Sequence, residues 1–338
     1  MTPAPVASCI DVHTHIVPGQ FPAYMGRHAD AAWPAMAPAQ PCHRHVMLSG
    51  KVYRTVSDRA WDPTRRLEDM AQQGVDRQVL SPMPELLSYW LDGADGAMLC
   101  RYLNEQIAAM VAAAPQKFFG LGSVPLQDMD RALVELEFAV RQLGFPGVEI
   151  GTNVNGAVLG DPALEPFFAA AEALGAAVFV HPLRPTGKER LVGPANLEQI
   201  LAFPSETGLA AASLLTSGVL ARHRSLRIVL SHGGGTLALL LPRLQHGWRT
   251  FEALRVQMPE APVDAACRFW VDSLVYDGGT LAQLIDRFGD AQVCVGSDFP
   301  FQISEQDPVG RIEALVLDPE ARDRLLSGNA LRWLGVTR

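Results

Sequence analysis

Short runs of apolar and β-branched residues recur along the chain, with helical patterns between them. Such alternation predicts βαβ units and a parallel sheet. We count eight of these runs, which is the number of strands in a (β/α)8 barrel. The predicted strands are Cys9 to His15, Val75 to Met83, Phe118 to Pro125, Gly147 to Gly151, Ala177 to Pro182, Arg227 to His232, Phe269 to Leu274 and Gln292 to Asp298.

The segments between these runs contain good helix candidates, and several begin with Asp or Pro, as helices commonly do. The tail from Ser304 to Arg338 is expected to add two closing helices. At 338 residues, the whole chain fits one barrel domain, since α/β barrels of this length are common. The predicted helices are Pro63 to Gln73, Asp95 to Ala114, Asp128 to Leu143, Asp161 to Leu174, Pro204 to Arg222, Thr236 to Leu254 and Gly279 to Phe288.

Two insertions interrupt the alternation. Residues 18–60, rich in Pro, Ala, Gly and aromatic residues, follow the first strand directly. Active sites of these barrels lie at the carboxyl ends of the strands, so we expect this insertion to fold over the pocket as a lid. A second insertion, residues 183–203, follows the fifth strand and is expected to face the substrate.

The charge of the chain favours a small-molecule partner. Its 28 Lys and Arg residues and 36 Asp and Glu residues give a formal net charge of −8, without a basic stripe for phosphates. We therefore expect no nucleic-acid partner. With 48% hydrophobic and 19% charged residues, the chain has the composition of a compact soluble enzyme.

The cysteines and the apolar stretches are typical of a cytoplasmic protein. The five cysteines are scattered, form no CxxC pair and are expected to be reduced thiols. The N-terminal sequence MTPAPVASCIDVHTH lacks the basic and apolar regions of a secretory signal. No uncharged apolar stretch reaches the roughly 18 residues that span a bilayer, so we expect no membrane partner.

The first predicted strand carries two histidines in the sequence IDVHTH. Alternate residues of a strand face the same side, so His13 and His15 both point inward at its carboxyl end. Two imidazoles on one side can chelate a metal ion. On its own, however, an HxH pair more often consists of surface or core histidines.

Three further residues of types that bind metals end other predicted strands. His181 ends the fifth strand, His232 the sixth and Asp298 the eighth. Any one of them alone would more often be a hydrogen-bonded structural His or a turn Asp. Together with the first strand they would converge on the functional face of one barrel, which chance explains poorly. The predicted metal ligands are His13, His15, His181 and Asp298.

Mixed His and carboxylate ligation suits a borderline divalent ion. One Zn²⁺ is expected, with Mn²⁺, Fe²⁺ or Co²⁺ as alternatives and no organic cofactor. Four protein ligands of this kind leave room for water or substrate, and water on such an ion loses a proton near pH 7. His232 is the expected acid/base, with Asp298 as a second catalytic candidate. The glycines 233–235 lead into a helix whose N-terminus suits an anion, or they form a tight turn.

Several motifs together resemble the metal-dependent amidohydrolase superfamily (amidohydrolase-related family 2) nearly from end to end. They look most like its decarboxylase branch, typified by 2-amino-3-carboxymuconate-6-semialdehyde decarboxylase. The resemblance implies a distorted (β/α)8, TIM-like barrel whose metal ligands and acid/base match the residues named above. The motifs are IDVHTH, GKVYRTV followed by WDP, LGSVPLQD, GFPGVEIGTNVNG, FVHP, SHGGGTLALLLPRL, GSDFPF and SGNA.

The resemblance also implies roles for three residues outside the metal site. It implies that Arg54 binds a substrate carboxylate, that Arg243 reaches the pocket of the neighbouring subunit in a homodimer, and that Phe301 lines the pocket. A guanidinium is the natural partner of a carboxylate, and two of them suit a dicarboxylate or leave one group free for loss as CO2. A surface ion pair is the alternative for each arginine, and core packing is the alternative for the phenylalanine.

The chain departs from the decarboxylase pattern on two strands. After His181 that branch carries Trp-Asp, whereas this chain reads PLRP. Within it, Arg184 is a candidate to bind an additional anionic group of the substrate, or it is a solvated loop cation. Where the family often has an amide, this chain has Glu149, which either orients a metal ligand or joins a structural ion pair. Asp272 and Ser273 on the seventh strand are further candidates to orient a ligand.

The expected function is nonoxidative decarboxylation of a carboxylated aromatic, pyridine or muconate-type catabolite, as the resemblance implies. Two routes are open. Either activated water adds to the conjugated system, with His232 as base, before CO2 leaves, or Asp298 or His232 protonates the ring carbon while the metal holds the substrate. In both routes a proton replaces the lost carboxylate.

Two alternatives use the same site. One is metal-dependent hydrolysis or hydration of a related acid, amide or lactone, which needs nearly the same pocket. The other is a non-catalytic barrel that binds a metal or a ligand. His232 argues against it, because a pure binding site needs no acid/base beside an open metal position. The substrate itself is not assigned, since its specificity lies in the insertions 18–60 and 183–203.

Overall fold

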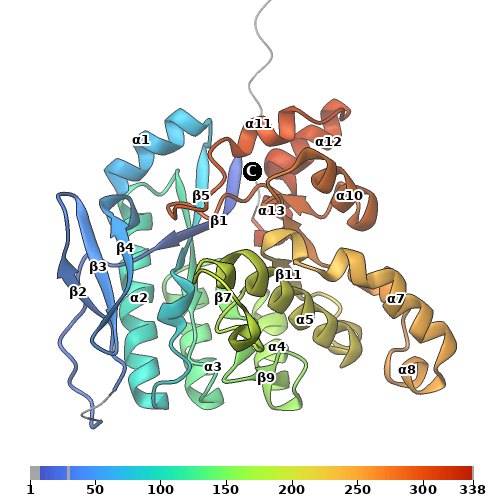
Figure 1. Ribbon diagram of the computed structural model, residues 1–338, viewed down its shortest axis with the longest axis horizontal. Helices are drawn as coiled ribbons and strands as arrows, with labels where there is room; N and C mark the ends of the chain where they lie inside the picture. Colours follow the sequence, from blue (N-terminus) through green and yellow to red (C-terminus); the bar gives the residue numbers. More distant parts are fainter. Residues whose placement is uncertain (1–7, 29–30, 337–338) are drawn as a thin grey trace, which may run out of the picture.

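Eight parallel strands form one sheet in the part of the chain that the computed structural model describes, residues 8–28 and 31–336 (Figure 1). Outside these ranges lie the first seven residues of the N-terminal sequence considered above, two residues of the first insertion and the last two of the tail. The prediction of an eight-stranded barrel is confirmed. In spatial order the strands are β1 (Ile10–Ile16), β5 (Arg77–Pro82), β6 (Phe118–Ser123), β7 (Gly147–Gly151), β10 (Ala177–His181), β11 (Arg227–Leu230), β12 (Trp270–Asp272) and β13 (Val293–Cys294).

The sheet closes into a barrel through contacts between β1 and the segment that follows β13. The backbone N–H of Val12 donates to the carbonyl of Val295 at 2.9 Å. The buried Asp11 carboxylate accepts from the backbone N–H of Ser297 at 3.1 Å and from its hydroxyl at 2.5 Å. Closure therefore brings the first and last strands to the same mouth of the barrel.

Apolar side chains fill the barrel below the strand ends. The register of β1 shifts between Asp11 and Thr14. As a result, Ile10 and Val12 pack with Phe179 inside the barrel, below the inward-facing His13 and His15. Trp333, near the carboxyl end of the described residues, is fully buried and packs against Phe179 of β10. The polar residues of the barrel interior are therefore confined to its upper layers.

Helices surround the sheet, and many begin where an Asp side chain caps the first turn. The carboxylate of Asp62 accepts from the backbone N–H of Thr64 at 2.8 Å, and Asp277 accepts from the N–H of Thr280 at 2.7 Å. No helix among the described residues is long and apolar enough to cross a membrane. The α-helices are α1 (Pro63–Gln73), α2 (Gly93–Ala113), α3 (Met129–Glu137), α4 (Glu165–Leu174), α5 (Phe203–Thr216), α6 (Val219–Arg222), α7 (Leu237–Thr250), α8 (Glu252–Gln257), α9 (Pro262–Ala266), α10 (Gly278–Phe288), α11 (Pro308–Glu313), α12 (Pro319–Asp323) and α13 (Asn329–Leu334).

Some predicted elements are interrupted. The helix expected over 204–222 breaks into α5 and α6 at Gly218, which has a φ of 77°. The helix expected over 236–254 breaks into α7 and α8 at Phe251, whose backbone is extended. The last strand is shorter than expected: β13 ends at Cys294, Val295 forms only an isolated bridge with Asp11, and Asp298 lies beyond them with a φ of 65°.

The first insertion forms a three-stranded antiparallel sheet, a structure that the composition of the segment did not predict. Its strands are β2 (Ala35–Pro38), β3 (His43–Leu48) and β4 (Lys51–Ser57), in that order. Between β3 and β4, Ser49 and Gly50 have φ values of 49° and 72°, which suits a tight hairpin turn. Buried Val46 and Val56 pack with Leu99 of α2 and with Phe301, and so attach this sheet to the mouth of the barrel.

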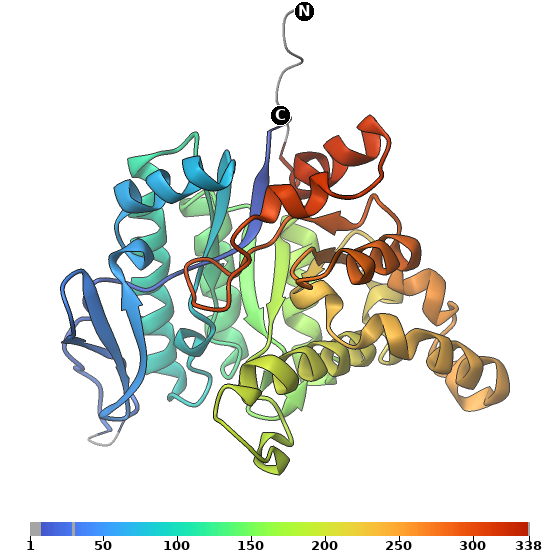
Figure 2. The ribbon, with the colours of Figure 1, turned by 45° about the horizontal axis from the view of Figure 1, so that its top comes forward.

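The second insertion contains a 3-10 turn, Lys188–Arg190, and a π-helical segment, Glu198–Ala202, that leads into α5. Further along the chain, α7 and α8 form an arm that extends away from the barrel. Figures 1 and 2 both place this arm at the opposite end of the molecule from the sheet of β2, β3 and β4.

Candidate metal centre

Four of the predicted site residues come together inside the barrel mouth. His13 and His15 lie on β1, His181 is the last residue of β10, and Asp298 follows β13. All four side chains are buried, with at most 6% of each residue exposed. One potential ligand atom from each lies within 4.8 Å of the corresponding atoms of the others. The strand-end prediction therefore describes a real cluster.

The Nε2 atoms of the histidines converge on one point. Nε2 of His13 lies 3.1 Å from Nε2 of His15, and the latter lies 3.2 Å from Oδ1 of Asp298. Oδ1 of Asp298 and Nε2 of His181 are buried atoms without a hydrogen-bond partner among the described residues. Buried polar atoms normally have a partner, so these two fit a positively charged ligand. Three imidazole nitrogens and one carboxylate oxygen fit a divalent metal ion.

The other ring nitrogen of each histidine is anchored. Nδ1 of His13 lies 2.6 Å from Oδ2 of Asp272, Nδ1 of His15 lies 3.0 Å from the carbonyl of Pro82, and Nδ1 of His181 lies 3.0 Å from the carbonyl of Pro182. A hydrogen bond at Nδ1 fixes the tautomer that leaves Nε2 free to bind a metal. All three rings are thus prepared as ligands in the same way.

Asp272, at the end of β12, orients two parts of the site. Besides the contact with His13, its Oδ2 accepts from the backbone N–H of His232 at 3.0 Å, and its Oδ1 accepts from Gly233 and Leu274 at 2.7 and 3.1 Å. Burial raises the pKa of Asp272, but the His13 interaction outweighs it, and the net pKa lies below its usual value. The carboxylate therefore stays ionised, in agreement with a role in orienting a ligand.

His232 stands beside the cluster rather than in it. Its ring centroid lies 5.3 Å from that of His13 and 5.2 Å from that of His181. Its φ of 55° is unusual for a residue other than Gly and is held by the hydrogen bond to Asp272. Nδ1 lies 3.2 Å from the hydroxyl of Ser231, which leaves Nε2 free. Burial, with His13 nearby, lowers the pKa of His232 to about 4, so its imidazole is neutral near pH 7.

The backbone of β1 is held from behind by a buried arginine. Arg66 of α1 is fully buried, and its guanidinium donates to the carbonyl of His15 at 2.5 Å and to Oε1 of Gln78 at 3.0 Å. Burial lowers the pKa of Arg66 to about 9. The arginine fixes the strand that carries two of the four candidate ligands, a support that the sequence did not suggest.

A cavity of about 310 Å³ opens directly above the cluster. His181, His232 and Asp298 face into its floor. The walls come from the first insertion, the turns after β5 and β11, the second insertion with α5, the loops after β12 and β13, and the start of α10. The other lining residues are Arg54, Pro84, Glu85, Gln199, Ile200, Phe203, Pro204, Gly235, Leu274, Val275, Tyr276, Thr280, Phe301 and Ile303.

Arg54 and Phe301 both line this cavity. The guanidinium carbon of Arg54, on β4, lies 4.1 Å from the ring centroid of Phe301. The same ring stacks on His15 with a centroid distance of 5.2 Å and an interplanar angle of 22°. The stack connects the sheet of β2, β3 and β4 to the candidate metal ligand His15 and holds the guanidinium of Arg54 at the cavity wall.

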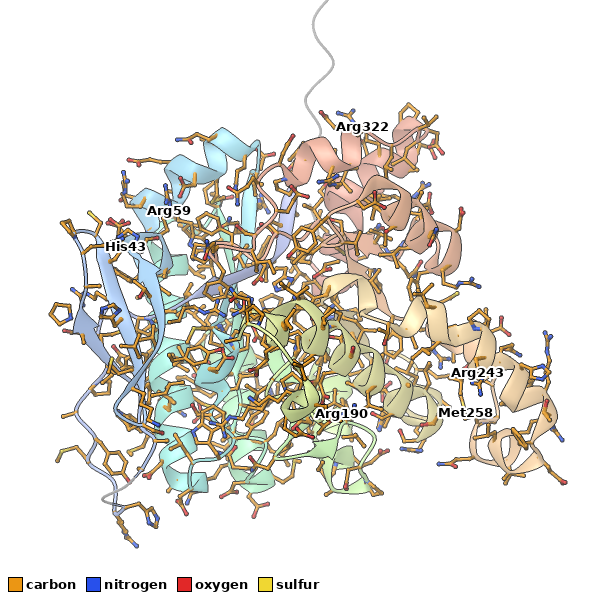
Figure 3. The ribbon with its side chains drawn as sticks, in the orientation of Figure 1. His43, Arg59, Arg190, Arg243, Met258 and Arg322 are labelled. Atoms are coloured by element: carbon orange, nitrogen blue, oxygen red, sulfur yellow. The ribbon has the colours of Figure 1, made fainter. Side chains whose placement is uncertain are left out.

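Two other predicted arginines lie outside the cavity wall. The guanidinium carbon of Arg184 lies 3.2 Å from the ring centroid of Trp90, so it stacks on that ring rather than lining the cavity. Arg243 is exposed on α7, and Figure 3 shows it far from the centre of the barrel. Within one chain, neither side chain is placed to contact a ligand in the cavity.

Glu149, in the centre of β7, is fully buried beside the cluster. Its Oε2 lies 3.7 Å from Nδ1 of His15, and burial raises the pKa of Glu149 to about 8. The hydroxyl of Ser273 accepts a hydrogen bond from the backbone N–H of Gly296 at 3.2 Å and so joins the segments after β12 and β13.

Two residues of the cavity wall, Glu85 and Tyr276, were not predicted from the sequence. Both lie in turns after strands, where no periodicity marks them.

The chain is similar to known proteins over most of its length. The model of the amidohydrolase family matches residues 10–336. A 2-amino-3-carboxymuconate-6-semialdehyde decarboxylase of Dictyostelium discoideum is 38% identical over 97% of this chain and 91% of its own. A 6-methylsalicylic acid decarboxylase of Penicillium expansum is 34% identical over 71% of this chain and 76% of its own.

A solved structure shares the fold. It is a dihydroxybenzoic acid decarboxylase of a Polaromonas species, with bound manganese and the inhibitor 2-nitroresorcinol. Its TM-score is 0.77 at 21% sequence identity, and the match covers 98% of both chains. At this identity the likeness concerns the barrel itself.

Proposed function

The chain belongs to the amidohydrolase family, and on that premise we propose that it is a metal-dependent, nonoxidative decarboxylase of a carboxylated aromatic, pyridine or muconate-type acid. It is thus a carbon-carbon lyase. The observation that carries the proposal is the convergence of three Nε2 atoms and one carboxylate oxygen on the floor of a cavity with a cation in its wall. Both curated relatives named above are decarboxylases, which favours this reaction over the hydrolytic and non-catalytic alternatives.

The residues that would hold the ion are His13, His15, His181 and Asp298. Their donor set suits Zn²⁺, which we take as the first candidate, and the manganese of the Polaromonas structure makes Mn²⁺ the second. When bound, a divalent ion supplies a positive charge that polarises substrate oxygens and stabilises developing negative charge.

Arg54 and Phe301 bind and orient the acid. The guanidinium offers a planar pair of donors to a carboxylate, and its stacking on Phe301 holds it at the cavity wall. The walls beside it are largely apolar and suit a ring, with Phe203, Leu274 and Val275 among the lining residues. The substrate is thereby held with one face toward His232 and Asp298 on the floor.

His232 handles the proton of the reaction. The bond between the substrate carbon and its carboxylate breaks, the electron pair stays on that carbon, and CO2 leaves. A proton then takes the place of CO2 on the carbon. His232 lines the cavity, and its Nε2 is free to move that proton because Nδ1 is engaged by Ser231. Since its imidazole is neutral near pH 7, Nε2 first takes up a proton from an acidic group of the substrate or from solvent and then delivers it to the carbon. Asp298 is the second group that is able to exchange a proton there. The buried setting keeps bulk water from competing with this transfer.

The active form is a homodimer in which Arg243 reaches the partner's cavity. Arg243 is exposed on α7, and so are apolar side chains of the α7 and α8 arm. They are Leu239 (79% exposed), Leu240 (46%), Phe251 (60%) and Val256 (79%). Several exposed large apolar side chains on one projecting arm favour burial against another chain. In that position the arginine would add a second cation to the carboxylate site.

The cysteines favour a reducing compartment such as the cytoplasm. All five are free thiols, and Cys9, Cys100 and Cys294 are buried. The chain therefore folds without a disulfide among its described residues.

The test of the proposed function combines metal analysis with a substrate panel. The protein is purified without chelator, its divalent metal is quantified, and CO2 release is measured with hydroxylated benzoates, pyridine acids and muconate-type acids. We expect about one ion per chain and CO2 release from at least one acid, with a product that carries hydrogen in place of the carboxylate. The absence of a stoichiometric divalent ion, or water addition without CO2 release, would contradict the proposal.

A further inference from the structure

A second charged group, of opposite sign to Arg54, faces the same cavity. Glu85 lies in the 3-10 turn Pro84–Leu87, directly after β5, and its side chain lines the cavity. Only 8% of the residue is exposed, so what exposure it has is toward the cavity. No role in metal binding or in the proton step falls to it, since it is absent from the ligand cluster.

The turn that carries Glu85 is rigid. Leu86 and Leu87, which follow it, have no exposed surface. The hydroxyl of Ser88 donates to the carbonyl of Glu85 at 3.0 Å, and the backbone N–H of Leu86 donates to the carbonyl of Met83 at 2.8 Å. A carboxylate on such a support keeps its place when a ligand enters, as a specificity contact requires.

The carboxyl group of Glu85 is not paired with either nearby arginine. Burial raises its pKa above the usual value, although the charge of Arg54 and a hydrogen bond with the Tyr53 hydroxyl oppose that shift. Among the ion pairs of the described residues, none within 4.0 Å joins Glu85 to Arg54 or to Arg184. The guanidinium of Arg54 is stacked on Phe301 and that of Arg184 on Trp90. Both cations are therefore held by aromatic rings and not by this carboxylate.

A ligand that fills the cavity must satisfy this carboxylate. The Tyr53 hydroxyl offers it one hydrogen bond, and a ring that fills the cavity excludes solvent from its other acceptor positions. A buried carboxylate left without a donor is strongly unfavourable. A bound molecule therefore gains affinity if it brings an N–H or O–H group to Glu85, and loses affinity if it brings a methyl group to the same place.

We propose that Glu85 is a specificity residue that accepts a hydrogen bond from an amino or hydroxyl substituent of the substrate. The inference rests on the proposed function, because it takes this cavity as the site of the acid. Arg54 and Glu85 then recognise two different groups of the same substrate. Arg54 selects for a carboxylate, and Glu85 selects among carboxylates for those that carry a hydrogen-bond donor.

The test measures binding, which separates it from the assay of CO2 release. The probes are four pairs of 2-hydroxybenzoates that carry either a hydroxyl or a methyl group at position 3, 4, 5 or 6. Dissociation constants are measured by calorimetry with the metal-loaded protein. The variants are Glu85→Gln, which keeps the size of the side chain, Glu85→Leu, which removes both acceptors, and Glu105→Gln, an exposed change on α2 as control.

For at least one position, we expect the hydroxyl acid to bind the wild-type protein about 10- to 100-fold more tightly than its methyl partner, since hydrogen bonds to charged groups contribute about 1.5–3 kcal/mol. The ratio of the two dissociation constants should fall close to one in Glu85→Leu and stay at the wild-type value in Glu105→Gln. In Glu85→Gln it should lie between one and the wild-type value. Metal content and thermal unfolding report whether each variant is intact.

Two results would overturn the inference. One is a wild-type protein that binds the acids without preferring any hydroxyl partner. The other is a preference that persists in Glu85→Leu. Either result leaves the proposed function standing if CO2 release is observed. If no acid binds the metal-loaded wild-type protein, the carboxylate site itself is wrong and the role of Glu85 fails with it.

Discussion

Oδ2 of Asp272 lies 2.6 Å from Nδ1 of His13, and the same oxygen accepts the backbone N–H of His232 at 3.0 Å. One carboxylate thus orients a candidate metal ligand and the residue proposed to move the proton. This coupling of the two functions predicts that a single change at Asp272 disturbs both.

Replacing Asp272 with Asn keeps the shape of the side chain but removes its negative charge. We expect metal affinity to fall about 10- to 100-fold, as is usual when a residue that orients a metal ligand is changed. The affinity is measured by competition with a chromophoric chelator. Asp286→Asn, an exposed change on α10, is the control and should leave affinity unchanged. Wild-type affinity in Asp272→Asn would show that the contact with His13 is not needed for binding.

His232→Gln should retain the metal and lose catalysis. Removal of a general acid/base commonly lowers kcat about 10²- to 10⁴-fold, and the four ligand atoms do not include His232. CO2 release and metal content are measured on the same preparation. Loss of the metal together with activity would instead place His232 among the ligands.

Arg54→Lys keeps the charge but removes the planar pair of donors that a carboxylate accepts. We expect KM to rise about tenfold or more, with a smaller change in kcat, because the arginine binds the acid and does not move a proton. Steady-state kinetics measure both constants. Lys51→Gln, exposed on the same strand, is the control. A fall in kcat at constant KM would contradict a binding role.

Mixing two inactive variants tests the role of Arg243 across a dimer. Arg243→Ala and His232→Gln are each expected to be nearly inactive alone. In a mixed dimer, one cavity would combine the intact His232 of one chain with the intact Arg243 of the other. CO2 release should therefore reappear after the two are unfolded and refolded together. No recovery in a verified mixed dimer would mean that Arg243 does not act from the partner subunit.

An ion-pair cluster on the outside of the barrel predicts acid sensitivity. Glu165 accepts from Arg222 at 2.6 Å, and Glu172 accepts from the backbone N–H of Ser225 at 2.8 Å. The hydrogen bond from Arg222 lowers the pKa of Glu165 to about 2, and the hydrogen bond from the Ser225 hydroxyl is the main cause that lowers the pKa of Glu172 to about 2.

A carboxyl group whose pKa is lower in the folded than in the unfolded chain stabilises the fold above the unfolded value, here 4.5, and loses that effect as the pH falls through about 2. The free energy of unfolding of the metal-free protein should therefore decrease between pH 4.5 and pH 2. Denaturant titrations at several pH values measure it. Glu172→Gln should show a weaker pH dependence over this interval, and a parallel curve would refute the assignment.

The barrel and its metal cluster were accessible from sequence because they depend on local periodicity. Inward-facing residues of a strand alternate, so His13 and His15 were assigned to one side, and His181 and Asp298 follow apolar runs that end at the mouth. The antiparallel sheet of the first insertion was not predicted, since its strands are short and lie in a segment rich in Pro, Ala and Gly.

Other parts of the site depend on contacts between distant segments, which a single sequence does not encode locally. The stacking of Arg184 on Trp90 joins the second insertion to the turn before α2, and no pattern in either segment indicates it. Glu85 lies in a turn where a Glu is ordinarily a solvated residue, and only the packing of β4 and α5 around it makes it part of a cavity.

The four candidate ligands come from the beginning, the middle and the end of the chain, and the seam between Asp11 and Ser297 lies beside two of them. A metal ion would therefore find the complete set of four ligands only after the segment that follows the last strand has been synthesised and docked. Metal capture becomes a late event that recognises a completed barrel. The free energy of metal binding would then stabilise the closed barrel, in which the final strand pairs with the first.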